Sequence, residues 1–464
     1  MSNFIFKIPY WVTYTTNAKQ EILVYNWKNK TSVVLYDTNH PAYYLFKNGE
    51  LDFDYKNLKY HSFIDDINWL VDNNFIVKAD ISKPDEYFLQ QDSALHIDNK
   101  LKVIDDDESL LLILLPAGEA CNLDCVYCYE DHKDKSRMGT EHIESLVSLI
   151  KSYNKKINQI EFFGGEPLLN LEFIKNFLNR LLDENINYVA SITTNGTLLT
   201  QEVFNELYHL NLKNYQITLD GLENTHNKLR CSKNKNFNSF ELVVSAIKVL
   251  ASSKFNDIKV LFRINVGIEL SLKENTDKFV EFLHDIVPCN DKRFFIFPKT
   301  IGDYASANNL DKIQISVDNK CFHSKGSSND IKYFEYLLIN NGYALGDIAF
   351  QLKKSGYACY AGNKNSFVIT PDNLIRKCTV ALNNPMNLVG VLQPDGQIKF
   401  NDNKNLWEKN YADEYCNTCF AQQTCTGNSC PLNNILSNKK NCPPLKQDYE
   451  FTTLKIVNFL QRNQ

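Results

Sequence analysis

Residues 121–128 have the sequence Cys-Asn-Leu-Asp-Cys-Val-Tyr-Cys, so three cysteines lie within one short segment. The apolar run Leu110–Leu115 precedes them and ends at Pro116, which predicts a buried strand followed by a loop. Three thiolates from one loop can hold three irons of a four-iron cluster and leave the fourth iron open to another ligand. The segment therefore predicts metal ligands at Cys121, Cys125 and Cys128.

A zinc site and a purely structural role are the alternatives for these three cysteines. A zinc site usually needs a fourth Cys or His ligand, and His132 is close enough in sequence to supply one. Three buried structural cysteines are less favoured, because the neighbouring Glu119, Asn122 and Asp124 are polar.

Composition limits the class of protein. The chain has 464 residues, enough for two or three domains, and its 44% hydrophobic and 23% charged residues are typical of soluble proteins. The net charge of −5 gives no basic field, so we expect no nucleic-acid partner and no attraction to anionic membranes. The 13 cysteines favour metal binding over disulfides in a chain without a secretion signal.

The N-terminus shows no targeting segment. The opening residues, Met-Ser-Asn-Phe-Ile-Phe-Lys, lack a basic start followed by a long apolar core. No run approaches 18 apolar residues, so we expect no membrane span. These features predict a cytoplasmic protein.

The central region alternates predicted strands and helices. The strands are expected at Leu110–Leu115, Gln159–Phe163, Tyr188–Thr193, Tyr215–Leu219, Lys259–Val266 and Arg293–Phe297. The helices are expected at Glu141–Tyr153, Leu171–Asp183, Gln201–Leu210, Ser239–Ser252 and Lys273–Ile286. Repeated βα units with right-handed crossovers predict an α/β fold, a partial (β/α)6 TIM-like barrel. Chemistry in such barrels lies at the C-terminal ends of the strands.

The second predicted strand ends in Gly164-Gly165-Glu166-Pro167. The two glycines allow a ligand to approach the backbone, because no Cβ is in the way. Glu166 can then accept hydrogen bonds from an ammonium group. On its own this segment would more often be a tight turn, but it follows the three-cysteine loop by one strand.

The next strands also end in polar residues. They are Thr193 and Asn195 on the third strand, Thr218 and Asp220 on the fourth with His226 and Arg230 after it, and Arg263 and Asn265 on the fifth. An Arg within a strand core needs a partner such as a carboxylate. Capping of the following helix by Thr197 or Thr200, or a purely structural role, accounts for these residues nearly as well. Cys231 and Cys289 have no spaced partners and are expected to be buried free thiols.

The first hundred residues predict a small α+β module. Strands are expected at Phe4–Tyr14, Glu21–Trp27 and Thr31–Tyr36, and helices at Pro41–Lys47 and Phe63–Asn73. A three-stranded sheet followed by helices is typical of a winged-helix-like module. The alternative is an N-terminal cap that only shields the barrel.

The C-terminal region is rich in cysteine. Cys359 and Cys378 flank a predicted hairpin around Pro371-Asp372-Asn373. They are followed by Cys416, Cys419, Cys425, Cys430 and Cys442. Seven cysteines are too many for one site and suit two four-iron clusters, although the compact run alone would also suit zinc.

The three-cysteine loop, with the aromatic Tyr127 before its third cysteine, resembles the signature of the radical S-adenosylmethionine (SAM) family. The resemblance implies a four-iron cluster, [4Fe-4S], whose open iron binds SAM, and electron injection that cleaves SAM to a 5′-deoxyadenosyl radical. It also implies that Gly164, Gly165 and Glu166 hold the methionine amine of SAM. The other residues implied to line the SAM site are Tyr127, Thr193, Asn195, Thr218, Asp220, Arg230, Arg263 and Asn265. No catalytic acid or base is indicated.

The C-terminal cysteines resemble the SPASM extension of radical SAM proteins, which carries two auxiliary [4Fe-4S] clusters. The distal cluster would then use Cys416, Cys419, Cys425 and Cys442, and the nearer one Cys359, Cys378 and Cys430. Two departures from the family pattern occur, since four residues separate Cys425 from Cys430 in place of three and Asn373 stands where Gly is typical. The fourth ligand of the nearer cluster is then Cys321, a substrate atom or none.

These resemblances imply the domain order. Residues 1–100 would form a peptide (leader) recognition domain, 109–305 the radical SAM core, 306–355 a bridge and 356–464 the SPASM domain with a C-terminal helix. A leader peptide would add a strand to the first domain in a groove between Ser32–Tyr36 and Ile64–Leu70.

The implied function is maturation of a ribosomally made precursor peptide by an intrapeptide crosslink. A thioether is favoured, and a carbon–carbon or carbon–oxygen bond is the variant. The implied partners are the precursor peptide with its leader and an external electron donor of flavodoxin or ferredoxin type. One rival is an anaerobic sulfatase-maturing enzyme, but those enzymes carry Asp after the second SPASM cysteine where this chain has Thr379. The other rival is a non-catalytic iron–sulfur or zinc scaffold that binds a peptide.

Overall fold

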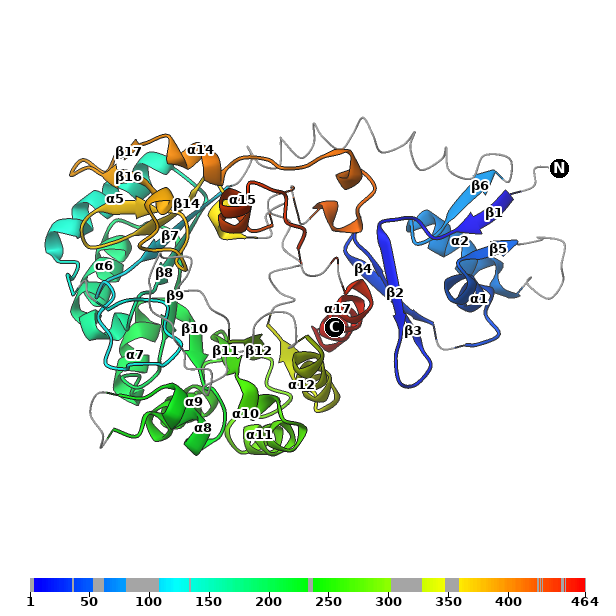
Figure 1. The fold of residues 1–464 in the computed structure, drawn as a ribbon, viewed down its shortest axis with the longest axis horizontal. Helices are drawn as coiled ribbons and strands as arrows, with labels where there is room; N and C mark the ends of the chain where they lie inside the picture. The colour runs from blue at the N-terminus through cyan, green and yellow to red at the C-terminus, as the bar shows by residue number, and fades with distance from the viewer. Residues whose placement is uncertain are drawn as a thin grey trace. The chain divides into compact units, whose positions relative to one another are not determined.

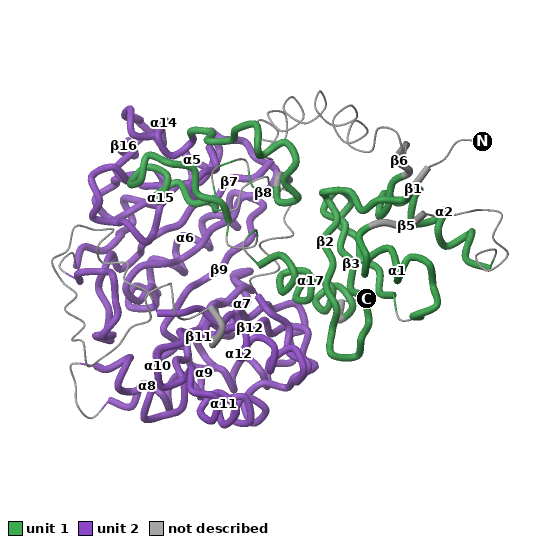
Figure 2. Tube along the Cα trace, turned by 45° about the vertical axis from the view of Figure 1, so that its right-hand side comes forward, with its two compact units in different colours: residues 1–107, 348–360, 409–464 green, residues 108–347, 361–408 purple. Residues whose placement is uncertain are grey.

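The computed structural model describes residues 4–35, 37–52, 62–80, 108–132, 135–232, 237–301, 328–346 and 359–463, except 424, 426, 428, 444, 445 and 447. Most of the predicted bridge, with Cys321, lies outside the described residues, as does Tyr36 of the predicted groove. The chain forms two compact units (Figure 2). The first unit comprises residues 1–107, 348–360 and 409–464, and the second comprises residues 108–347 and 361–408.

The second unit is built on a sheet of parallel strands. They are β7 (Ser109–Leu114), β8 (Ile157–Phe162), β9 (Tyr188–Thr194), β10 (Leu212–Thr218), β11 (Lys259–Val266) and β12 (Phe294–Thr300). Each strand pairs in parallel with the next one in the chain. This arrangement confirms the predicted partial barrel, and all carboxyl ends of these strands share one edge of the sheet.

Helices cover the outer face of these strands (Figure 1). The longer ones are α5 (Thr140–Tyr153), α6 (Leu171–Asp183), α7 (Gln201–His209), α9 (Ser239–Ala251), α11 (Lys273–Ile286) and α12 (Ser328–Asn340). Two short helices that the sequence did not predict, α8 (Glu223–Leu229) and α10 (Ile268–Ser271), follow β10 and β11. The Thr200 side chain accepts a hydrogen bond from the backbone N–H of Val203 and so caps α7. Within the described residues, no helix has both the length and the apolar character that crossing a bilayer requires.

An antiparallel extension continues the barrel sheet beyond β7. Strand β14 (Ser366–Ile369) pairs in parallel with β7, and β15 (Leu374–Arg376), β16 (Leu388–Leu392) and β17 (Ile398–Phe400) follow in antiparallel order. The predicted hairpin is confirmed as β14–β15. Its turn places Asn373 at φ 60°, a left-handed conformation that Asn adopts more readily than most residues. Part of the region predicted as the SPASM domain thus continues the barrel sheet.

Strand β13 (Ala344–Leu345) pairs in parallel with β12 at the end of the barrel sheet. The remaining short elements are η2 (Pro167–Asn170), η4 (Tyr360–Gly362), η5 (Pro385–Asn387), α14 (Asn403–Trp407), η6 (Glu414–Cys416), η7 (Phe420–Gln423) and α15 (Pro431–Ser437).

The N-terminal part of the first unit contains two small sheets, where the sequence predicted one. Strands β2 (Val12–Thr16), β3 (Ile22–Asn26) and β4 (Thr31–Leu35) form one antiparallel sheet. Strand β1 (Phe4–Lys7) pairs with β5 (Glu50–Asp52) and β6 (Val77–Asp80) in the other. The predicted strand Phe4–Tyr14 was wrong, because the chain turns at Pro9, whose carbonyl accepts from the N–H of Val12 at 3.0 Å. Helices α1 (Pro41–Asn48) and α2 (Ile64–Asp72) formed as predicted.

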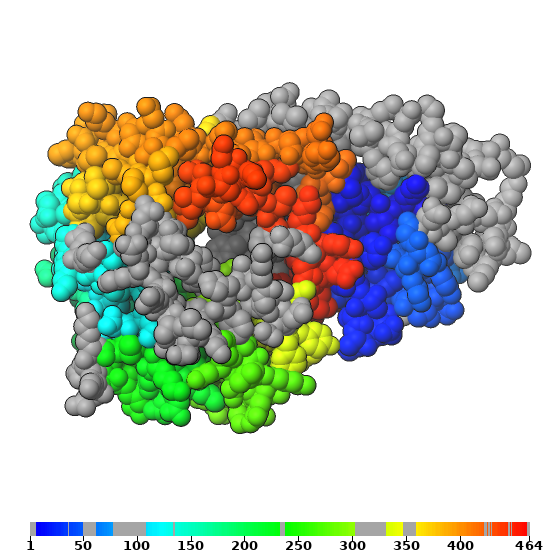
Figure 3. Space-filling model, in the orientation of Figure 1, coloured from blue at the N-terminus to red at the C-terminus, as the bar shows by residue number. Residues whose placement is uncertain are grey.

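The C-terminal helix α17 (Tyr449–Asn463) packs against β2 and β3. Figure 3 shows these C-terminal residues, in red, directly beside the N-terminal residues in blue. The Thr453 hydroxyl donates to the Thr13 hydroxyl at 2.7 Å, which in turn accepts from the indole N–H of Trp27 at 2.9 Å. The fully buried Trp27 ring lies 5.3 Å from the ring of Phe420. The first and last segments of the chain therefore share one core.

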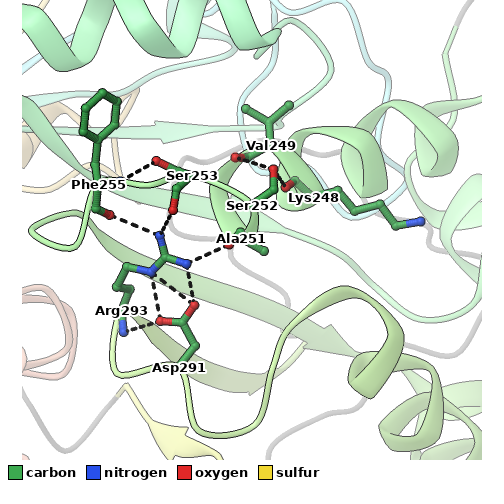
Figure 4. Close-up of polar contacts among 8 residues, drawn as sticks. All are labelled: Lys248, Val249, Ala251, Ser252, Ser253, Phe255, Asp291 and Arg293. Carbon is green, nitrogen blue, oxygen red and sulfur yellow. Dashed lines mark hydrogen bonds and ion pairs between the residues drawn. The ribbon is translucent and has the colours of Figure 1, made fainter.

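Arg293, just before β12, ties together the loop that follows α9 (Figure 4). Its guanidinium donates to the carbonyls of Ala251 at 2.7 Å, Ser253 at 2.8 Å and Phe255 at 3.1 Å. It also forms an ion pair with Asp291 at 2.6 Å, and both side chains are only 12% exposed. The contacts hold the end of α9 against the start of β12.

Replacing Arg293 with alanine is expected to lower the free energy of unfolding by about 3–5 kcal/mol, because Asp291 and three carbonyls lose their donor. Denaturant-induced unfolding followed by circular dichroism measures this loss. The matched control is Arg180→Ala, since Arg180 pairs with Glu144 and Glu184 on an open surface and its loss should change little. Equal stability of the two variants would show that the Arg293 contacts contribute nothing.

Candidate active site

The three-cysteine loop follows β7 and so lies at the edge where the parallel strands end. Burial raises the pKa of all three thiols, to about 12 for Cys121. Metal ligation requires the thiolate forms, which burial disfavours. The positive charge of bound iron would stabilise these thiolates. No group of three His, Cys, Asp or Glu among the described residues is arranged to hold a single metal ion.

The loop backbone is fixed by the segment that follows α8. The N–H of Asp124 donates to the carbonyl of Cys231 at 2.7 Å, and the N–H of Val126 donates to the carbonyl of Leu229 at 2.9 Å. The Cys231 thiol, predicted to be buried, is partly exposed and donates to the Asp124 carbonyl at 2.9 Å. Sequence analysis missed this pairing, because no motif marks residues 229–231.

The glycines of the Gly164-Gly165 turn bring two backbones together. A Cβ on Gly164 would lie 2.4 Å from the carbonyl oxygen of Gly118, and a Cβ on Gly165 would lie 2.3 Å from that of Ala120. Gly164 also has φ 107°, a conformation that other residues rarely adopt. The turn therefore packs directly against the backbone that leads into the three-cysteine loop.

Glu166 is fully buried, and its carboxylate accepts three hydrogen bonds from the chain. The donors are the N–H of Leu168 at 3.0 Å, the hydroxyl of Thr194 at 2.8 Å and the N–H of Asn195 at 2.7 Å. A carboxylate offers about four acceptor positions, so one remains for a ligand. Glu166 thus joins the ends of β8 and β9, and its contact with the SAM amine stays a prediction.

Asn195 connects the end of β9 to the three-cysteine loop. Its side-chain N–H donates to the carbonyl oxygen of the Asn122 side chain at 2.8 Å and lies 3.7 Å from the sulfur of Cys121. Hydrogen bonds to cluster sulfurs tune the reduction potential of iron–sulfur sites. Thr193, in contrast, donates to Glu161 at 3.0 Å within the sheet.

The residues predicted at the ends of β10 and β11 gather around Tyr127. Asp220, Arg230 and Asn265 are all hydrogen-bonded to its hydroxyl. Arg263 donates to the side-chain oxygen of Asn265 at 2.9 Å, and its guanidinium lies 5.3 Å from the ring centre of Phe297. Thr218 is buried beside them at the end of β10.

His226 is buried and accepts a hydrogen bond from the backbone N–H of Asp220 at 3.1 Å. Burial and the nearby Arg230 lower its pKa from 6.5 to about 3, so the folded protein keeps this imidazole neutral. The unfolded chain binds a proton below pH 6.5, so stability is complete above that pH and falls as the pH drops toward 3.

This titration predicts a difference between wild type and His226→Asn, which keeps an acceptor and cannot ionise. Between pH 7.5 and 5.5 the wild type should lose about 1.4 kcal/mol more unfolding free energy than the variant. Denaturant unfolding at the two pH values measures the loss. Identical pH dependence in both proteins would contradict the buried neutral state.

Four cysteines of the first unit surround one pocket. Cys416, Cys419, Cys425 and Cys442 line a small cavity of about 20 Å³, together with Lys440 and Lys446. The amine of Lys440 pairs with Asp413 at 2.5 Å and lies 3.5 Å from the sulfur of Cys416. These are the four cysteines that the SPASM resemblance assigned to the distal cluster. Cluster binding by them stays a prediction.

The other three C-terminal cysteines are divided between the units. Cys359 and Cys430 belong to the first unit, whereas Cys378 belongs to the second and is buried after β15. Cys378 is one of the groups that raise the pKa of Tyr129, after burial, Glu130 and Cys128. It therefore lies near the three-cysteine loop, and a shared cluster of these three cysteines stays a prediction.

A four-iron cluster with SAM suits the residues of this edge. The loop offers three thiols with raised pKa, and the Asn195 amide lies beside one sulfur. Cys121, Cys125 and Cys128 would hold the cluster, and the backbone around Gly164–Glu166 would lie next to the cofactor.

Comparison with known proteins agrees with this geometry. Residues 115–286 match the model of the radical SAM superfamily. The chain is 28% identical over 208 residues to a cysteine-type anaerobic sulfatase-maturating enzyme of Clostridium novyi, covering 40% of this chain and 54% of that protein. It is 25% identical to the radical SAM cyclopropyl synthase TigE of Paramaledivibacter caminithermalis, covering 66% of each chain. The chain thus spans only about half to two thirds of these two relatives.

Two solved structures share the fold. One is native anSMEcpe with bound AdoMet and the Cp18Cys peptide, at 20% identity and a TM-score of 0.53, covering 76% of this chain and 96% of that one. The other is Streptococcus suis SuiB bound to its precursor peptide SuiA, at 15% identity and a TM-score of 0.50, covering 94% and 97%. The motif, the barrel and the match over residues 115–286 identify a radical SAM domain in this chain.

Proposed function

We propose that this chain is a radical SAM maturase that installs an intrapeptide crosslink in a ribosomally made precursor peptide. With a four-iron cluster and SAM bound, sites of this class cleave SAM reductively and abstract a hydrogen atom from the substrate. The observation that carries the peptide assignment is the open edge of β4. Within the described residues, β4 pairs only with β3.

The β4 edge lies beside an apolar surface. Val33 and Leu35 of β4 are partly buried against the same core as Ile64 and Val71 of α2. A peptide that adds a strand to β4 would gain backbone hydrogen bonds there, and its alternate side chains would contact this surface. The predicted groove between Ser32–Tyr36 and Ile64–Leu70 would include these residues, and leader binding in it is part of the proposal.

The comparisons support a peptide substrate. SuiB was solved with a precursor peptide, anSMEcpe was solved with a peptide, and TigE is named a cyclopropyl synthase. We propose a thioether as the favoured bond, with a carbon–carbon or carbon–oxygen link as the variant. An external electron donor of flavodoxin or ferredoxin type would supply the reducing electron.

The test is anaerobic co-expression with each short open reading frame that flanks the gene, followed by mass measurement of the peptide. Loss of two hydrogens is the expected result, because a crosslink joins two atoms that each lose one. An unmodified peptide, together with no release of 5′-deoxyadenosine under reductant, would instead favour a non-catalytic scaffold.

Sulfatase maturation is the second candidate, because a cysteine-type anaerobic sulfatase-maturating enzyme is among the relatives. That reaction would replace a cysteine thiol by an aldehyde, so the product would lose sulfur. The same mass measurement, made with a sulfatase-derived cysteine peptide, separates the two candidates.

A further inference from the structure

The hydroxyl of Tyr127 is fully engaged in hydrogen bonds. It donates to a carboxylate oxygen of Asp220. It accepts from the guanidinium of Arg230 at 2.9 Å and from the side-chain amide of Asn265 at 3.0 Å. A phenol has one donor and two acceptor positions, so these three bonds use its whole capacity.

The three partners come from separate parts of the barrel and are themselves fixed. Asp220 follows β10, Asn265 is on β11 and Arg230 follows α8, and they are 0%, 8% and 7% exposed. The second carboxylate oxygen of Asp220 accepts from the backbone N–H of Asn265 at 3.1 Å. Asp220 also forms a buried ion pair with Arg230 at 3.8 Å. Although Nε of Arg230 finds no partner among the described residues, every bond of the Tyr127 hydroxyl is made, and a buried group bonded in this way is held rigidly.

Tyr127 lies between two of the three proposed cluster ligands. Next to it, the N–H of Val126 donates to the carbonyl of Leu229, the residue before Arg230. The N–H of Cys128 donates to the carbonyl of Cys125 at 3.0 Å. The loop is therefore held through its backbone and through the Tyr127 side chain by the same α8–β11 region.

We propose that Tyr127 is a positioning residue whose hydroxyl, held by Asp220, Arg230 and Asn265, fixes the three-cysteine loop for its cluster. The network gives these three side chains a role other than direct contact with SAM. The inference rests on the proposed function, because it requires that the loop hold a cluster.

Tyr127→Phe removes the hydroxyl and keeps the ring, and Tyr215→Phe is the matched control. Tyr215 is buried on β10 and donates to the carbonyl of Leu212 at 3.0 Å, away from the loop. After anaerobic reconstitution, excess ferrous-iron chelator is added and the decay of the SAM-sensitive EPR signal is followed, since that signal reports the three-cysteine cluster. The signal of Tyr127→Phe should decay about 10- to 100-fold faster than that of wild type. Equal decay in both tyrosine variants would overturn the inference.

Asn265→Ala provides a second, independent measurement that also holds if Tyr127→Phe fails to fold. It removes one donor to the hydroxyl, so the decay of the SAM-sensitive signal should again accelerate. A raised KM with normal decay would show direct SAM contact and overturn the inference.

The double variant measures the coupling of the two residues. If Asn265 acts through the hydroxyl, adding Asn265→Ala to Tyr127→Phe should accelerate decay no further, and fully additive effects would count against the network. If the wild type gives no SAM-sensitive signal, both the proposed function and this inference are overturned. If the wild type gives the signal and the variants lose it at the wild-type rate, only the inference is overturned.

Discussion

Replacing Cys125 with alanine is expected to remove about four iron atoms per chain and to abolish the release of 5′-deoxyadenosine from SAM. The three cysteines of the loop supply every protein ligand that the motif offers to this cluster, and two thiolates leave two irons without one. The change should exceed that of substitutions in the barrel outside the loop, because the nearby thiol of Cys231 is already hydrogen-bonded to the Asp124 carbonyl. Iron content and nucleoside release, both measured anaerobically, check the prediction.

The matched control is Cys289→Ala, which removes a partly exposed thiol from the same unit. Cys289 follows α11 and is far in sequence from the loop, so both readouts should remain at wild-type values. Full iron content in Cys125→Ala would show that the loop holds no cluster, and reduced iron in both variants would point to misfolding.

Replacing Cys425 with alanine is expected to remove about four iron atoms as well, but to leave SAM cleavage in place. Cys425 lines the pocket of the first unit, whereas the three-cysteine loop belongs to the second unit. The two sites have no residue in common, so the loss of one need not empty the other. Conversion of the peptide should nevertheless fall at least tenfold, because an auxiliary cluster would accept the electron that crosslinking leaves behind.

Lys446→Gln is the control for this second change, since Lys446 lines the same pocket without a thiol. It should retain the iron content of wild type. Normal iron in Cys425→Ala would contradict a cluster in the pocket, and loss of SAM cleavage together with the iron would contradict the independence of the two sites.

Much of the barrel follows from the order of apolar runs along the chain. Each predicted strand from Leu110 to Phe297 formed within about three residues of its expected ends, because parallel strands buried on both faces are continuous apolar runs. The turn at Gly164-Gly165 was also evident in the sequence. The sequence did not show why glycines are needed at this turn. Only the structure shows that the backbone carbonyls of Gly118 and Ala120 lie where a Cβ would be.

The contacts inside the candidate site were less predictable. Tyr127 lies 93 positions before Asp220 and 138 before Asn265, and no local pattern links residues so far apart. The same limit applies to Glu166, whose donors on β9 are known only once β8 and β9 are placed side by side. Cys416, Cys419, Cys425 and Cys442, which the family resemblance grouped together, line one pocket, and a cluster bound by them stays a prediction.

The packing of α17 against β2 and β3 has a consequence for biosynthesis. Thr453, which contacts Thr13 on one face of the N-terminal sheet, is synthesised 440 residues later, so this face lacks its partner while the intervening chain is made. The first hundred residues therefore emerge early with an incomplete core, and domains that lack a late segment expose apolar surface to aggregation. We infer that nascent chains need a chaperone until α17 has been made, and that products truncated before α17 are removed by proteases.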